Sequence, residues 1–211
     1  MNENQPLSRP LQIVAWTIVL LVVAGITGLF LVQQSRKSNL PVYGEVGNFT
    51  LTNQLGETVA AADLKGKVWV ADIIFSRCAG PCPKMTEQMA LIQEAFNEAE
   101  SLRLVTLTTD PEFDTPPVLA KYGSKFGADA DRWWFLTGSK DQIRRLGIEG
   151  LKLTAIEKEE SQQENEADLF IHSTIFVLVD SEGRLRGIYE SLEPGFQEKI
   201  ANDIRALLQE A

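Results

Sequence analysis

Two cysteines with three residues between them follow an apolar run, and the chain has no other cysteine. They are Cys78 and Cys82, in the order Cys-Ala-Gly-Pro-Cys-Pro. The chain also has a single histidine, His172, at the start of a second apolar run. Thiolate and imidazole are ligands of soft metal ions, and Cu(I) suits such a set better than zinc, which usually takes a fourth ligand. The two thiols could instead exchange disulfides, because a thiolate attacks the sulfur of a disulfide.

The elements expected around the cysteines are compatible with both metal binding and disulfide exchange. Residues 67–75 predict a central strand, and Pro83 suits the first turn of a following helix, where its missing N–H costs nothing. Cysteines four positions apart at a helix start would lie on one side of it and could form a disulfide if their Cα atoms come within about 7 Å. We expect the positive end of the helix to lower the pKa of these thiols. A purely structural disulfide is disfavoured, since so small a loop would restrict the unfolded chain little.

The rest of the chain alternates strand and helix patterns. This order predicts an α/β domain with a mixed sheet flanked by helices. Residues 157–168, EKEESQQENEAD, are almost wholly polar and predict a solvated loop or a mobile flap just before the strand of His172. We expect further strands over residues 49–52, 102–108, 133–136, 171–179 and 184–189, and helices from 83, from 115, over 139–146 and at the C-terminus.

Residues 11–32 form an uncharged apolar run. Such a run can cross a bilayer as a helix, for which roughly 20 residues suffice. A cleaved signal peptide would have a shorter apolar region of about 7–15 residues, so we expect a retained single-pass anchor. Residues 1–10 would then be a short tail and residues 33–44 a linker to a domain of residues 45–211. No cysteine lies directly after the run, which argues against a lipid anchor of the lipoprotein type.

Charge bears on location and on partners. Arg9 precedes the apolar run, and Arg36 and Lys37 follow it, so the flanking charges do not fix an orientation. A lone N-terminal anchor before a large domain commonly places that domain outside, and the chain has no mitochondrial presequence. We therefore expect a bacterial inner-membrane protein whose domain faces the periplasm or the cell exterior. The net charge of −9, without a basic stripe, excludes nucleic acid as an expected partner.

The ordered motifs of the chain resemble those of the Sco/SenC family, which are membrane-anchored, thioredoxin-like proteins involved in copper delivery to cytochrome c oxidase. The resemblance spans residues 45–211 and implies a thioredoxin-like mixed sheet flanked by helices, with an N-terminal transmembrane helix. Any one motif alone would be weak, but together and in order they are strong. The motifs are Cys78-x-x-x-Cys82-Pro83, TDPEFDTP at 109–116, WFLTG at 134–138, residues 168–173 ending in His-Ser, and VDSEGR at 179–184.

The resemblance implies roles for individual residues. Cys78, Cys82 and His172 would be the ligands of copper, as Cu(I) and also as Cu(II). Asp110 would contact the ligand residues or a partner protein, with the capping of a loop as an equal alternative. The chain departs from the family in one respect. The family usually carries Cys-Pro-x-x-Cys, whereas Pro81 here directly precedes the second cysteine.

Two functions follow, of which the first is favoured. A copper chaperone would pass the metal by ligand exchange to a cytochrome c oxidase subunit or another copper protein, without enzymatic turnover. A membrane-anchored thiol–disulfide oxidoreductase would use Cys78 and Cys82 as catalytic residues to reduce a partner, although such enzymes usually have Cys-x-x-Cys. A peroxidase is a poorer third, because no acid–base residue is evident beside the thiols. Outside the cytoplasm a Cys78–Cys82 disulfide would tend to form, so an external thiol reductant is an expected partner.

Overall fold

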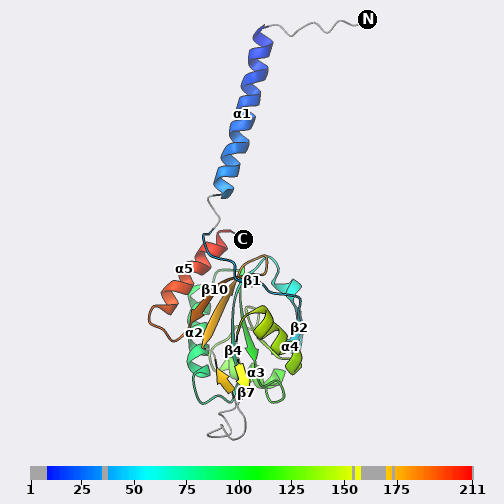
Figure 1. Ribbon diagram of the computed structural model, residues 1–211, viewed down its shortest axis with the longest axis vertical. Coiled ribbons are helices and arrows are strands. Elements are labelled where there is room, and N and C mark those ends of the chain that lie inside the picture. Colours follow the sequence, from blue (N-terminus) through cyan, green and yellow to red (C-terminus); the bar gives the residue numbers. More distant parts are fainter. Residues whose placement is uncertain (1–8, 35–37, 154, 158–169, 173, 211) are drawn as a thin grey trace, which may run out of the picture. The chain divides into compact units, whose positions relative to one another are not determined.

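The computed structural model describes residues 9–34, 38–153, 155–157, 170–172 and 174–210 (Figure 1). The chain divides into two compact units, Met1–Ser38 and Asn39–Ala211. Helix α1 (Arg9–Gln34) belongs to the first unit. Within the ranges just given, no helix has the length and apolarity needed to span a membrane. The anchor over residues 11–32 therefore stays a prediction.

The second unit is built on a six-stranded mixed sheet in the order β1-β10-β9-β4-β5-β6. Strands β4, β5 and β6 are parallel to one another, whereas β9 is antiparallel to both β4 and β10. Every residue of β4 is buried, as expected for a central strand covered on both faces. The strands are β1 (Gly44–Glu45), β4 (Val68–Ile74), β5 (Leu102–Thr108), β6 (Trp133–Leu136), β9 (Ile175–Val179) and β10 (Arg184–Glu190).

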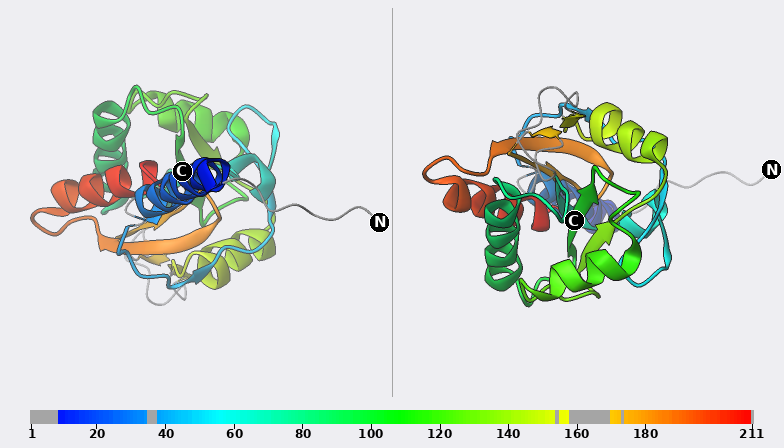
Figure 2. Two further views of the ribbon diagram at one scale, coloured as in Figure 1. Left: turned by 90° about the horizontal axis from the view of Figure 1, so that it is seen from above. Right: turned by 90° about the horizontal axis from the view of Figure 1, so that it is seen from below.

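Helices cover one face of this sheet, and a mixture of short elements covers the other (Figure 2). The first face carries α2 (Cys82–Ala95), α3 (Pro116–Ser124) and α5 (Phe196–Leu208), whose apolar stripes pack on β4 and its neighbours. The predicted mixed α/β fold is thus confirmed. The second face carries β2 (Thr50–Thr52), β3 (Thr58–Ala60), η1 (Ala61–Leu64), α4 (Lys140–Arg144) and the π-helical turn η2 (Arg145–Gly150).

The expected single strand over residues 171–179 is wrong. Phe170–His172 form β8, which pairs with β7 (Ala155–Glu157) in a separate two-stranded sheet, and only β9 joins the main sheet. Thr174 lies between them, where its hydroxyl donates to Glu190 and its carbonyl accepts from the N–H of Ser191 at 2.8 Å. An apolar run predicts extended chain, but it does not show where the chain changes its pairing partner.

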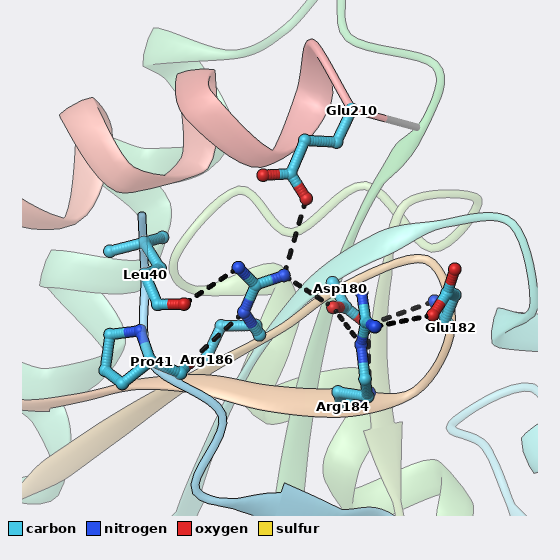
Figure 3. A network of polar contacts seen from close by, with 7 residues as sticks. All are labelled: Leu40, Pro41, Asp180, Glu182, Arg184, Arg186 and Glu210. Carbon is cyan, nitrogen blue, oxygen red and sulfur yellow. Dashed lines mark hydrogen bonds and ion pairs between the residues drawn. The ribbon is translucent and has the colours of Figure 1, made fainter. Parts of the chain in front are cut away.

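A buried ion-pair network ties the first residues of this unit to β10 (Figure 3). Arg186 donates to Asp180 Oδ2 at 2.8 Å and to the carbonyls of Leu40 and Pro41 at 2.9 and 3.2 Å. Burial acts to raise the pKa of Asp180, but hydrogen bonds from Arg186 and Arg184 lower it on balance. Asp180 directly follows β9, whose end pairs with the beginning of β4, so this network lies at the end of the sheet where β4 begins.

Candidate metal centre

The two cysteines lie in the connection that follows the central strand. Strand β4 ends at Ile74, and α2 begins at Cys82 itself, with Pro83 in its first turn as predicted. Cys78 does not belong to the helix, contrary to the expectation that both thiols lie at its start. It lies in the preceding loop, where its N–H donates to the carbonyl of Phe75 at 3.2 Å. The two thiols are therefore positioned by different elements, one by the loop and one by the helix.

Both cysteines are free thiols, and both are buried: Cys78 is 8% exposed and Cys82 is 0% exposed. The N–H of Gly80 donates to Cys78 Sγ at 3.4 Å, which orients this sulfur. A hydrogen bond with Cys78, together with burial and the charge of Cys78, raises the pKa of the Cys82 thiol. The expected lowering by the helix end is thus wrong for Cys82, because the neighbouring sulfur and burial outweigh it. A metal ion that binds both sulfurs must displace this firmly held proton.

The turn between β5 and α3 supplies two carboxylates to the residues just before Cys78. Asp114 is 0% exposed and accepts hydrogen bonds from the N–H of Ser76 at 3.0 Å, from the Ser76 hydroxyl and from the Thr108 hydroxyl. Burial raises the pKa of Asp114, against the effect of these hydrogen bonds. Asp114 was not predicted from the sequence. Nothing in the sequence of the segment 109–116 distinguishes the fully buried Asp114 from Asp110 or from the exposed Glu112.

Asp110, the acid that the sequence singled out in this turn, pairs with a residue next to a thiol. Arg77 Nη2 donates to Asp110 Oδ2 at 2.6 Å, and the Arg77 guanidinium lies 4.1 Å from the centre of the Phe113 ring. The Asp110 side chain is 11% exposed, and that of Arg77 is 37% exposed. Asp110 therefore holds, through Arg77, the loop of residues 75–81 that carries Cys78 (the cysteine loop), while its contact with a partner protein stays a prediction.

A third carboxyl group, also missed from the sequence, is buried within β4. Asp72 is 0% exposed, and neither of its carboxylate oxygens has a hydrogen-bond partner among the described residues. Burial raises the pKa of Asp72 from 3.8 to about 7. The charge of Asp72 also contributes to the raised pKa of Cys82. A lone acid inside the run Val-Trp-Val-Ala-Asp-Ile-Ile was the signal that could have found it.

His172 is the last residue of β8, where its backbone is paired with Ala155. Strand β9 begins three residues later and runs antiparallel to β4, so its first residues lie beside the end of β4 from which the cysteine loop leaves. The backbone of His172 thus comes to the same end of the sheet as the thiols. Its side chain lies outside the described part of the structure, as do residues 158–168 of the predicted flap. Among the side chains that are described, no group of three or more His, Cys, Asp or Glu residues could hold a metal ion.

The fold and the paired thiols define a thioredoxin-like protein, and comparison with known proteins gives its family. The family model SCO1/SenC matches residues 39–209, and the chain belongs to this family. It is 32% identical over 188 residues to the SCO1 protein homolog of Bacillus subtilis (strain 168), across 88% of this chain and 94% of that protein.

Two solved structures support the family assignment. A SCO1/SenC family lipoprotein from Bacillus anthracis superposes with a TM-score of 0.69 at 32% identity, over 79% of this chain and 96% of that one. BsSco is a member of the Sco family of cytochrome c oxidase assembly proteins in which a disulfide switch has been identified. It superposes with a TM-score of 0.68 at 32% identity, over 82% of this chain and 97% of BsSco. The predicted thioredoxin-like fold and family are therefore confirmed.

Proposed function

We propose that this chain is a copper-binding chaperone that delivers the metal during assembly of a cytochrome c oxidase. The observation that carries the proposal is the pair of buried, free thiols at the end of the sheet to which the topology brings His172. Sulfur ligands of this kind select Cu(I) over harder metal ions. The family membership and the description of BsSco as an oxidase assembly protein support the same class of function.

The proposed ligands are the Cys78 and Cys82 thiolates and the His172 imidazole. Three such ligands satisfy Cu(I), and Cu(II) could add water or a carboxylate. Copper would leave by ligand exchange, in which ligands of the acceptor replace these three in turn. Because Cys78 lies in a loop and is the more exposed thiol, it is the sulfur that an incoming protein can reach first.

The proposed location is the bacterial inner membrane, with residues 11–32 as a single-pass anchor and the domain of residues 45–211 in the periplasm or outside the cell. The B. anthracis relative is a lipoprotein, which supports membrane attachment as a property of related proteins. An oxidising location would also make an external thiol reductant necessary, because a Cys78–Cys82 disulfide cannot bind Cu(I) as two thiolates.

We expect the reduced full-length chain, in detergent, to bind one Cu(I) tightly and His172→Ala to bind it at least about 10-fold more weakly. Even groups that only support a ligand cost about 10–100-fold in affinity when removed, so the loss of an imidazole ligand should cost no less. The measurement is a competition titration against a chromophoric Cu(I) chelator. The oxidised chain is the control and should not compete. Equal affinities of the parent and His172→Ala would remove the histidine from the site.

A second function, thiol–disulfide exchange, is favoured by the hydrogen bond between the two free thiols, which leaves little movement needed for a disulfide to form. The test mixes the reduced chain with a disulfide-bonded peptide and excess reduced glutathione. A chaperone is expected to reduce at most about one equivalent of peptide beyond the glutathione background. Sustained turnover that disappears in Cys78→Ser would instead establish the oxidoreductase.

A further inference from the structure

We propose that Asp114 is the positioning residue of the cysteine loop, which holds Ser76 and, through it, sets the place of Cys78 Sγ relative to Cys82 Sγ. The inference rests on the proposed function, because the spacing of the two sulfurs matters most where both bind one metal ion. Through the spacing of the two sulfurs, Asp114 controls both the affinity for copper and the ease with which the Cys78–Cys82 disulfide forms.

The first step is the pair of hydrogen bonds by which the Asp114 carboxylate holds Ser76. Its carboxylate accepts from the Ser76 N–H at 3.0 Å and also from the Ser76 hydroxyl, so both polar groups of this residue are held at once. The Thr108 hydroxyl, at the end of β5, donates to the same carboxylate at 2.5 Å. Asp114 itself is fixed by its own N–H, which donates to the carbonyl of Asp110 at 2.8 Å. A buried carboxylate with three donors is held far more rigidly than an exposed side chain.

The second step leads from Ser76 to the sulfur. The N–H of Cys78 donates to the carbonyl of Phe75, so residues 75–78 form a tight turn that contains Ser76. The N–H of Gly80 then donates to Cys78 Sγ at 3.4 Å. Cys82 is positioned independently, as the first residue of α2. The separation of the two sulfurs therefore depends on where the loop is held, and Asp114 holds it at Ser76, next to the Arg77–Asp110 ion pair.

The third step explains why a carboxylate is needed. Ser76 and Thr108 present three donors, and both carboxylate oxygens accept from them. An amide in the same place keeps one oxygen for the Ser76 N–H and the Thr108 hydroxyl, and its NH₂ group faces the Ser76 hydroxyl, which must then accept instead of donate. All three hydrogen bonds also lose their charged acceptor and weaken, so the hold on Ser76 is loosened. Asp114→Asn is thus a nearly isosteric change that loosens the loop without removing either thiol.

The test compares Asp114→Asn, Ser76→Ala and the double variant, all as full-length chains in detergent. We expect Asp114→Asn to weaken Cu(I) binding about 10-fold, within the range of groups that orient metal ligands. The equilibrium constant for oxidation by glutathione disulfide, which forms the Cys78–Cys82 disulfide and two glutathione thiols, should fall by a similar factor. Ser76→Ala should have a smaller effect, and the double variant should be no weaker than Asp114→Asn alone, because the two residues act through one contact.

The matched control is Asp180→Asn, which alters another buried carboxylate, at the end of the sheet where β4 begins. It should lower the resistance to urea and leave copper affinity and the disulfide equilibrium unchanged. The inference is overturned if folded Asp114→Asn matches the parent in both measurements, or if its effects add to those of Ser76→Ala. A parent that binds no Cu(I) would refute the proposed function, while the disulfide equilibrium would still decide the role of Asp114. If Asp114→Asn does not fold, Ser76→Ala and Thr108→Val carry the same test.

Discussion

Replacing Cys82 with serine is expected to abolish tight Cu(I) binding, with a loss well beyond the about 10–100-fold that supporting groups cost. Cys82 is fully buried, hydrogen-bonded to Cys78 and fixed at the start of α2, so no other soft ligand can take its place without moving the helix. A serine hydroxyl is a hard and weakly acidic ligand that Cu(I) does not favour. The measurement is a chelator competition on reduced chains, with tryptophan fluorescence to confirm folding.

Met85→Leu is the matched control for this substitution. Met85 carries the next sulfur along α2, is 0% exposed and lies in the apolar stripe that packs on the sheet. Leucine keeps its volume and apolar character, so copper affinity should stay within about threefold of the parent value if Met85 serves packing alone. A Cys82→Ser variant that binds Cu(I) within 10-fold of the parent would contradict the two-thiolate site.

The strands that the sequence predicted best are those whose signal is local. Leu102–Thr108 and Trp133–Leu136 were expected and are observed with the same bounds. Each is a short apolar run bounded by turn residues, which is the pattern of a buried strand. The run over residues 171–179 has the same local pattern but divides into β8 and β9, because pairing partners far along the chain decide where a strand ends.

In the candidate site, too, local features were predictable from the sequence and long-range contacts were not. Cys78 and Cys82 were found because they are rare and closely spaced, and these features are visible in the sequence. Asp114 was missed because its partner Ser76 lies 38 residues away, and only the fold brings them together. The direction of the Cys82 pKa was wrong for a related reason. A helix end acts on any residue placed there, whereas burial and the neighbouring sulfur depend on tertiary packing that the sequence does not display.

Replacing Asp72 with asparagine is expected to stabilise the folded chain by up to about 4 kcal/mol at pH 8 and by much less near pH 4. The pKa of Asp72 is raised from 3.8 to about 7 by burial. In the unfolded chain the carboxyl loses its proton near pH 4, whereas in the folded chain it keeps the proton until about pH 7. Each pH unit between these values therefore lowers the stability of the parent by about 1.4 kcal/mol.

Asparagine resembles the protonated carboxyl in shape and cannot ionise, so this loss should disappear in the variant. Its own buried amide has a cost, since no hydrogen-bond partner faces Asp72 among the described residues. That cost is independent of pH. The informative quantity is therefore how the difference in free energy of unfolding between Asp72→Asn and the parent changes from pH 4 to pH 8. Urea unfolding of both full-length chains in detergent, followed by tryptophan fluorescence, measures it.

Asp180→Asn supplies a control of opposite sign. The pKa of Asp180 is lowered on balance by Arg186 and Arg184. Its ionised carboxylate therefore stabilises the folded chain above the pKa that Asp180 has in the unfolded chain, and this stabilisation is lost as the pH falls. This variant should destabilise the chain at pH 8, where Asp72→Asn stabilises it. A stability difference between parent and Asp72→Asn that stays constant from pH 4 to pH 8 would show that Asp72 titrates normally. The buried carboxyl would then be compensated by a group that the described contacts do not contain.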